Sequence, residues 1–486
     1  MGKPFLTLED LKACFSLFCC VYGVGTLGMP GNYARAGAAY ATVALLFMAA
    51  VNIYASVAIS KVMLVAPKSV RTYGDLGEWA MGAWGRWLVV VSQMLVCTMV
   101  PCVFLVLGGT LLDVLFPDSF KPGVWIVFMG ISLLPVCLIP TLKEGAFAAA
   151  AGCLGTVTAD IIGLSVLVYN MTPKSLSTPA AHLTFKGVTS VFGNLSLAYG
   201  AGIVIPALQR EHSDPTRMPR VVFVTLSLIS VFFLTLAITG WSVVGCQIPG
   251  NLLFAIAGTK LGWSADRGAV VMAFLFMQLH ITIAFSVILF PAMYTLERLV
   301  LGLHKRDAND DDNKVYQDAA TPGEVDESVA DVTKLRTSSI KSIVSVAEIE
   351  CVNEEADINE YNAPGVYVKV ALLRIILVAL CVLVSVLLKD RFLDLQDFVG
   401  ASSMSLCCMI LPVVFYLKVF YTKMGFPEKA FAVIVILVVC FLGVYVSYTT
   451  GKTLFAPEDP DPAILFPYCP PEYQKMVYTN TTFYQS

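Results

Sequence analysis

Long apolar stretches alternate with short polar segments along most of the 486-residue chain. A helix that crosses a bilayer needs roughly 20 predominantly apolar residues. By this measure the sequence predicts eleven membrane-spanning helices, and we expect an all-α membrane protein. The predicted spans are residues 11–37, 39–65, 87–115, 123–141, 145–169, 188–208, 219–243, 268–296, 366–388, 394–417 and 428–448.

One long polar segment interrupts this pattern between the eighth and ninth spans. Of the 35 acidic residues in the chain, 15 lie between Asp307 and Glu360. Low apolar content together with many charges predicts a disordered loop. The expected organisation is spans one to eight in residues 1–301, an acidic cytoplasmic loop in 302–362, spans nine to eleven in 363–450, and an irregular extracytoplasmic tail in 451–486.

Two of the spans contain glycine-rich interruptions. The first span carries the segment Gly23–Pro30 and the sixth carries Tyr199–Pro206, and each has a Gly-x-Gly followed by a proline. Glycine weakens a helix and proline removes a hydrogen-bond donor, so a broken span must satisfy its freed backbone groups elsewhere. Matched interruptions in two halves of a chain indicate a transporter binding site near the bilayer midplane.

Composition supports the membrane assignment. The chain is 57% hydrophobic and only 14% charged, whereas a soluble domain is about 25% charged. The 14 cysteines and 4 histidines show no metal-ligand spacing, and most of the cysteines lie in apolar runs, where cysteine acts as a small hydrophobic residue. The sequence shows no basic stripe for nucleic acid, no cleavable signal peptide and no nucleotide-binding motif.

Positive charges predict the orientation, because Lys and Arg accumulate on the cytoplasmic side. With a cytoplasmic N-terminus and eleven spans, 22 of the 32 basic residues fall on the cytoplasmic side. The glycosylation triplets beginning at Asn170 and Asn480 then lie outside, which makes both asparagines candidate acceptors. A third triplet, at Asn194, falls inside the sixth span and is expected to stay unmodified.

Several motifs in consistent order resemble a known family. They are Gly23–Pro30 with Ala34 and Gly37, Tyr73-Gly74-Asp75-Leu76-Gly77 with Gly82 and Gly85, Lys143-Glu144, Tyr199–Pro206 with Glu211 and Pro215, and His280 with Pro291 and Glu297. Together they resemble the amino acid/auxin permease family, within the amino acid–polyamine–organocation superfamily. The resemblance implies a five-plus-five inverted repeat, as in LeuT-like transporters, in which spans one to five and six to ten are related and the eleventh is extra.

The resemblance also implies secondary active amino acid transport by alternating access. A free amino acid is a zwitterion, so half-helix N-termini suit its carboxylate and half-helix carbonyl ends suit its ammonium. The alternative is that the glycines only allow close helix packing, but two matched segments, each with a proline, favour a site. The expected substrate-binding residues are Gly23, Val24, Gly25, Thr26, Tyr199, Gly200 and Ala201.

Four polar side chains inside the spans are candidates for ion coupling. His280 is a candidate for proton coupling or substrate contact, or is a neutral histidine bonded to a helix carbonyl. Thr282 and Ser286 share a helix face and offer hydroxyls to sodium, although such hydroxyls more often bond to their own helix. Asp160 is a proton acceptor, a partner for a basic side chain, or a structural hydrogen-bonding group, and the structural role is favoured.

No resident cofactor is expected, and the coupling ion is H+ or Na+, with H+ favoured by the resemblance and by His280. The second hypothesis is an amino acid sensor that signals through residues 302–362. A polytopic enzyme lacks a catalytic constellation, and a major-facilitator transporter predicts unbroken spans. The sequence leaves open the amino acid, the oligomeric state, and whether the membrane is the plasma membrane or a vacuolar or lysosomal one.

Overall fold

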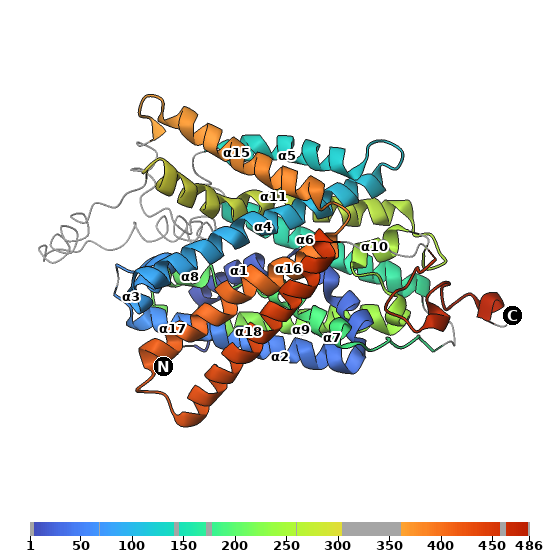
Figure 1. Cartoon of the computed structure of the whole chain (residues 1–486), viewed down its shortest axis with the longest axis horizontal. Helices are drawn as coiled ribbons and strands as arrows, with labels where there is room; N and C mark the ends of the chain where they lie inside the picture. Colours follow the sequence, from blue (N-terminus) through green and yellow to red (C-terminus); the bar gives the residue numbers. More distant parts are fainter. Residues whose placement is uncertain are drawn as a thin grey trace, which may run out of the picture.

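The computed structural model describes residues 4–67, 69–139, 145–171, 177–258, 260–303, 361–456 and 463–484. Helices dominate these ranges (Figure 1). The principal ones are α1 (Leu8–Val21), η1 (Val24–Gly28), α2 (Met29–Val65), α3 (Tyr73–Met81), α4 (Ala83–Leu115), α5 (Pro122–Leu138), α6 (Gly145–Met171), α7 (Phe185–Ala198), α8 (Ile205–Glu211), η2 (Pro215–Arg217), α9 (Met218–Val244), η3 (Gly245–Gln247), α10 (Leu252–Ala257), α11 (Arg267–Val300), α15 (Val366–Leu387), α16 (Phe392–Val399), α17 (Leu411–Phe420) and α18 (Phe426–Phe455).

The all-α membrane architecture expected from the sequence is confirmed. Eight helices in the described residues are long and apolar enough to cross a membrane. The number eleven stays a prediction, because broken spans divide into pieces that are too short to count, and α5 has only 17 residues. The expected loop at 302–362 falls almost entirely outside the described residues, as do Lys143 and Glu144.

A kink at Gly37 divides α2 into two parts. Gly37 has φ 72° and ψ 157°, outside the helical region, while its neighbours on both sides are helical. Glycine adopts this positive φ without the steric cost that a Cβ atom brings. The part before Gly37 completes the first predicted span, and the part after it forms the second.

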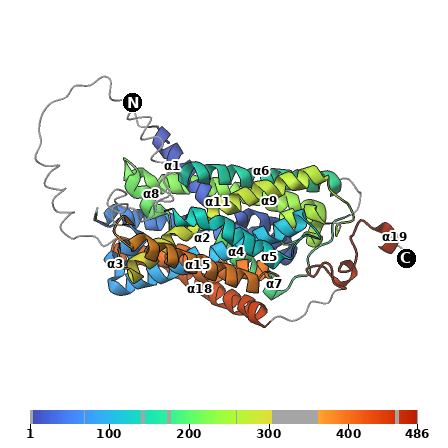
Figure 2. The same ribbon diagram turned by 90° about the horizontal axis from the view of Figure 1, so that it is seen from above.

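The packing of the helices follows the repeat that the resemblance implies. The interrupted first span contacts the interrupted sixth, because η1 packs against α7. The second span packs against the seventh (α2 on α9), the third against the eighth (α4 on α11), and the fourth against the ninth (α5 on α15). Figures 1 and 2 both show α5 beside α15. The first four spans thus meet their counterparts in the other half.

The bundle has two distinct ends. We call the end that carries the start of α1, α3 and the end of α17 the N-terminal face (Figure 1). The opposite end carries η3, α10 and the C-terminal segment 463–484, and a disulfide between Cys246 and Cys469 joins η3 to that segment. We call this end the disulfide face. The sequence did not predict the disulfide. The tail was expected to be irregular, and it is so only in part, because this covalent link fixes its position on the bundle.

Hydrogen bonds add to this attachment of the tail. The side-chain amide of Gln247 donates to the carbonyl oxygens of Tyr473 and Met476 at 2.9 and 2.8 Å. Its amide oxygen accepts from the backbone N–H of Tyr478 at 2.9 Å. The tail segment therefore packs on the helix bundle as part of the fold.

Candidate functional site

The first span is interrupted immediately after α1. The backbone of Tyr22 is extended (φ −81°, ψ 97°), Gly23 is also non-helical, and the 3-10 helix η1 follows before α2 begins at Met29. Pro30 lies in the first turn of α2, a position where the missing N–H would have no intrahelical partner. The predicted break is therefore present, at the predicted residues.

The sixth span is interrupted in the same way. α7 ends at Ala198, residues 199–204 are not helical, and α8 begins at Ile205 with Pro206 in its first turn. Both breaks thus consist of a helix end, a short glycine-containing segment and a proline that starts the next helix. Since η1 contacts α7, the two breaks meet inside the bundle.

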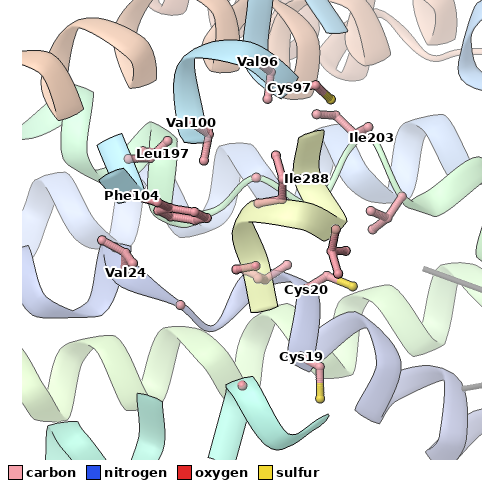
Figure 3. A pocket seen from close by; sticks show the side chains of 18 of the residues that line it. Cys19, Cys20, Val24, Val96, Cys97, Val100, Phe104, Leu197, Ile203 and Ile288 are labelled. Atoms are coloured by element: carbon pink, nitrogen blue, oxygen red, sulfur yellow. The ribbon is translucent and has the colours of Figure 1, made fainter. Parts of the chain in front are cut away.

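A cavity of about 140 Å³ lies where the two breaks meet (Figure 3). Its wall is formed by the end of α1, the start of η1, the end of α7, and the facing sides of α4 and α11. Most of the wall is apolar, including the labelled side chains Cys19, Cys20, Val24, Val96, Cys97, Val100, Phe104, Leu197, Ile203 and Ile288. A cavity of this size can hold a molecule with about as many heavy atoms as benzene.

The structure brings only part of the predicted set to this cavity. Gly23, Val24, Gly25, Gly200 and His280 line it. The other predicted residues that the structure describes do not: Thr26, Tyr199, Ala201, Asp160, Thr282 and Ser286.

Tyr199 is directed away from the cavity. Its ring packs edge-on against Phe233, and its hydroxyl donates to the Ser230 hydroxyl at 2.7 Å. The side chain of Tyr199 therefore anchors the sixth break to α9, while the neighbouring Gly200 faces the cavity.

The glycines of the first break have two different roles. A Cβ atom added at Gly23 would lie 3.0 Å from Nε2 of His280, in the cavity wall. One added at Gly25 would lie 2.6 Å from Cβ and 2.7 Å from Cα of Ala198. Gly25 is thus needed for the close approach of the two breaks, and both interpretations of the glycines, cavity and packing, apply at different positions.

His280 links the cavity to α6. Its Nδ1 lies 3.1 Å from the carbonyl oxygen of Gly152. A carbonyl only accepts, so Nδ1 must carry a proton, and in the neutral ring Nε2 is then an acceptor. Nε2 is the nitrogen close to Gly23. The histidine therefore has both a structural bond and an acceptor at the cavity wall.

The two hydroxyls considered as sodium ligands bond to their own helix. Thr282 is exposed and donates to the carbonyl of Gln278 at 2.8 Å. Ser286 is buried and donates to the carbonyl of Ile283 at 3.0 Å. Such back-bonding is the common behaviour of helical hydroxyls, and this geometry adds nothing to the sodium interpretation.

Buried polar pairs join the spans between the cavity and the disulfide face. Arg35 at the end of the first span forms an ion pair with Asp397 of α16, and both side chains are at most 5% exposed. Arg35 also donates to Oδ1 of Asn32 at 2.9 Å. Nearby, the amide of Gln396 donates to Asn194 of α7, which is fully buried, as expected for a silent glycosylation triplet.

The N-terminal face carries a different cluster, around Asp10. Its carboxylate accepts from Nε of Arg217 at 2.8 Å and lies 3.1 Å from Nε2 of His212. Burial raises the pKa of Asp10, but hydrogen bonds from Arg217 and Thr7 outweigh it and lower the pKa to about 2. Glu9 accepts from the backbone N–H of Ser213 at 2.7 Å. The cluster ties the start of α1 to the segment after α8.

The structure adds little about the two candidate glycosylation sites. Asn170 lies in the last turn of α6, and its amide donates to the carbonyl of Val166 at 2.8 Å. Asn480 is half-buried in the C-terminal segment, where its side-chain oxygen accepts from the backbone of Phe483 at 3.3 Å. Modification of either asparagine stays a prediction.

The sequence did not reveal most of the cavity wall. Val96, Val100 and Phe104 of α4 and Ile288 of α11 are apolar residues in apolar spans, so their pattern does not separate a cavity wall from a lipid-facing or packing position. The one available signal is adjacency to the glycine breaks, which would have indicated Cys20 and Leu197.

Comparison with known proteins places the chain in a family. The model of the family described as "Transmembrane amino acid transporter protein" matches residues 9–452. Amino acid transporter AVT1I of Arabidopsis thaliana is 26% identical over 251 residues, which cover 49% of this chain and 60% of that protein. Amino acid transporter AVT1J of Arabidopsis thaliana is 23% identical over 262 residues, covering 51% of this chain and 60% of that protein.

Solved structures with a similar course of the chain are more distant. The crystal structure of MhsT in complex with L-phenylalanine aligns with a TM-score of 0.45 at 12% identity, covering 89% of this chain and 98% of that one. A Na+-coupled sialic acid symporter aligns with a TM-score of 0.43 at 12% identity, covering 93% and 91%. The family match, which extends over most of the chain, shows that this protein belongs to the transmembrane amino acid transporter family.

Proposed function

We propose that this protein is a secondary active transporter that moves a neutral amino acid with an apolar side chain by alternating access, driven by a proton gradient. The observation that carries the proposal is the meeting of two interrupted spans at one apolar cavity. The matched relatives are named amino acid transporters, and the chain spans 60% of the length of the first two.

The backbone at the breaks suits the charged groups of an amino acid. Cys19, Cys20 and Val21 at the cavity form the carbonyl end of α1, and Leu197 and Ala198 form the carbonyl end of α7. These ends carry partial negative charge and favour an ammonium group. Val24 and Gly25 begin the helical run that continues into α2, and the N–H groups at such a start favour a carboxylate.

The remainder of the cavity selects the side chain. In its wall, the side chains from α4 and α11 are apolar apart from His280, and no charged side chain from the described part of the chain lines it. A charged substrate side chain buried there would lose its hydration without gaining a partner, which is costly. We therefore expect apolar side chains to be accepted and acidic or basic ones to be rejected.

The position of the cavity along the bundle supports an inward-facing state. Val96 and Cys97 lie in the half of α4 nearest the N-terminal face, and Ile288 and Pro291 lie in the corresponding half of α11. The other side is closed by Arg35 and Asp397. The disulfide face is external in this proposal, because disulfides persist in oxidising compartments.

The test is uptake by the purified protein in liposomes, with a panel of neutral, acidic and basic amino acids under a pH gradient or a sodium gradient. We expect accumulation of apolar amino acids that depends on the pH gradient. Gly200→Val should abolish uptake, since its Cβ alone would lie 2.9 Å from Cε of Met404 and the branched side chain fills the cavity.

The matched control is Gly123→Val in α5, where an added Cβ meets only ordinary contacts at 3.6 Å or more. This variant should transport like the unmodified protein. Absence of amino acid flux in the unmodified protein under every gradient, or normal flux in Gly200→Val, would contradict the proposal.

A further inference from the structure

Asp160 is unusual among the buried carboxyl groups of the protein. In the described residues, four acidic side chains are at most 3% exposed: Asp10, Asp160, Glu297 and Asp397. Asp10 and Asp397 are paired with Arg217 and Arg35. The Arg374 guanidinium lies 2.6 Å from the Glu297 carboxylate. Asp160 lies near the middle of α6, and no described basic side chain forms an ion pair with it.

The neighbours of Asp160 come from the first break. The hydroxyl of Tyr22 donates to its Oδ2 at 3.0 Å. The hydroxyl of Thr26 lies near the same carboxyl group, but Thr26 Oγ1 and Asp160 Oδ1 both lack a partner with hydrogen-bond geometry. Tyr22 and Thr26 are at most 2% exposed. One oxygen of the carboxyl group is therefore buried without a hydrogen-bond partner, close to the Thr26 hydroxyl of the first break.

The other elements packed on α6 bring no compensating charge. α9 contributes the rings of Phe232 and Phe233, which surround Tyr22, and α10 is apolar throughout. α11 contributes His280, whose Nδ1 is engaged by the carbonyl of Gly152. α1 contributes the thiols of Cys19 and Cys20, and Tyr22 caps its C-terminal end. A carboxylate without a cation in such a place is very costly, and the neutral acid is the stable form.

We propose that Asp160 is the proton carrier of the transport cycle and that the first break couples its proton to the substrate. In the state described here Asp160 holds the proton, which can be donated from Oδ1 toward Thr26 while Oδ2 accepts from Tyr22. Tyr22 directly precedes Gly23, which lines the cavity. A substrate that shifts the first break therefore changes the hydrogen bonds of Asp160, and one proton is taken up on one side and released on the other.

This assignment gives His280 a different role. Its ring is fixed by Gly152, and its Nε2 faces Gly23 at the cavity. As an acceptor, Nε2 is suited to an N–H of the substrate ammonium. His280 is thus a substrate-positioning residue, and Asp160 is the group whose protonation changes.

The experiment rests on the proposed function and separates the two claims. Liposomes containing the unmodified protein or Asp160→Asn are assayed for amino acid exchange without an ion gradient, for accumulation under a pH gradient, and for substrate-dependent acidification of the lumen. Asn keeps the shape of Asp160 and mimics the neutral acid. We expect exchange to persist in Asp160→Asn, whereas a gradient of about one pH unit no longer gives the roughly tenfold accumulation expected for one proton per substrate.

Two further variants guard against a folding defect. Asp160→Glu should recover part of the proton-driven accumulation, and Tyr22→Phe should keep the fold while changing the pH dependence of uptake. Thr235→Ala, exposed on α9, is the control that should change neither property. In parallel, the infrared band of a protonated carboxyl group should be present in the unmodified protein and missing from Asp160→Asn, which can be measured without any transport.

The outcomes are distinct. Proton-driven accumulation and substrate-dependent acidification that survive in Asp160→Asn would overturn the assignment while leaving the transporter proposal intact. Accumulation that follows only a sodium gradient would overturn it as well. Absence of all amino acid flux in the unmodified protein would instead contradict the proposed function, and the carboxyl band would still report on Asp160.

Discussion

The two faces of the bundle are held together in different ways. On the disulfide face, Arg35 and Asp397 form a buried ion pair that joins the first and tenth spans, and the tail is fastened nearby by the disulfide. On the N-terminal face, Asp10 and Arg217 join the start of α1 to η2, where Arg217 is 10% exposed and Glu9 is 40% exposed. The first closure is buried between spans, and the second is partly exposed at the rim.

This difference indicates which end opens with the smaller free-energy change. Separating Arg35 from Asp397 leaves two buried charges that must be hydrated or re-paired, whereas at the N-terminal face Asp10 is fully buried but its partner Arg217 and the neighbouring Glu9 already reach solvent. The Asp10 cluster also connects the inner halves of both interrupted spans, α1 and α8. We therefore interpret the disulfide face as the sealed end and the N-terminal face as the end where the interrupted helices move together.

The largest expected effect is the loss of Arg35. Arg35→Ala leaves the Asp397 carboxylate buried without its cation, and breaking such a pair costs about 3–5 kcal/mol. We expect a large fall in the thermal stability of the purified protein and loss of proton-driven uptake. Differential scanning fluorimetry and liposome uptake measure the two effects.

The partner variant sharpens this prediction. Asp397→Asn in the Arg35→Ala background removes the unpaired charge, so the double variant should be more stable than Arg35→Ala alone. Equal stability of the single and double variants would show that the ion pair does not hold the sealed end.

The second effect concerns the crossing of the two breaks. Gly25→Ala places a Cβ 2.6 Å from Cβ of Ala198, and overpacking of this kind costs about 1–3 kcal/mol. Uptake should be strongly reduced because both breaks must shift. Gly258→Ala is the control, since an added Cβ there meets no atom within 4 Å, and wild-type behaviour of Gly25→Ala would contradict the close crossing.

The third prediction tests the N-terminal face. Asp10→Asn removes a charge that accepts from Arg217, and such hydrogen bonds contribute about 1.5–3 kcal/mol. Since folding lowers the pKa of Asp10 from 3.8 to about 2, the stabilisation is complete above pH 4 and is lost as the pH falls toward 2. Thermal melts of both forms, in a His212→Gln background that removes the neighbouring imidazole, should differ by a constant amount from pH 5 to 8.

This account of the N-terminal face would be contradicted if, in the His212→Gln background, the difference in thermal stability caused by Asp10→Asn changed between pH 5 and 8. A second possible contradiction is increased stability without any change in transport, since the cluster is interpreted as holding the moving end.

These residues show how much of the structure could be predicted from the sequence. The glycine–proline segments predicted both breaks and four residues at the cavity, because glycine and proline interrupt a helix where they occur in the chain. Arg35 lies near the end of the first predicted span, and it is buried against a partner 362 residues away. Likewise, Cys246 and Cys469 are 223 residues apart. Such partners depend on how the spans pack, and a single sequence does not specify that pairing.

The smallest effect is expected at the disulfide itself. Cys246→Ser releases the covalent link, but Gln247 still bonds to the segment at Tyr473, Met476 and Tyr478. Uptake should be largely retained because neither cysteine lines the cavity, whereas loss of the disulfide lowers stability and lets protease cut the tail faster. Strongly reduced uptake with an intact fold would show that the tail takes part in closing the sealed end.

The most direct test of the central claim is protection of Cys20, which lines the cavity beside the first break. Cys20 is kept as the sole free cysteine, with the Cys246–Cys469 pair retained, and is labelled with a membrane-impermeant thiol reagent from each side. We predict labelling from the side of the N-terminal face and protection by a transported amino acid, with no such protection for Cys440 in α18 as the sole free cysteine. Labelling of Cys20 that is equal with and without substrate would contradict a binding site between the two breaks.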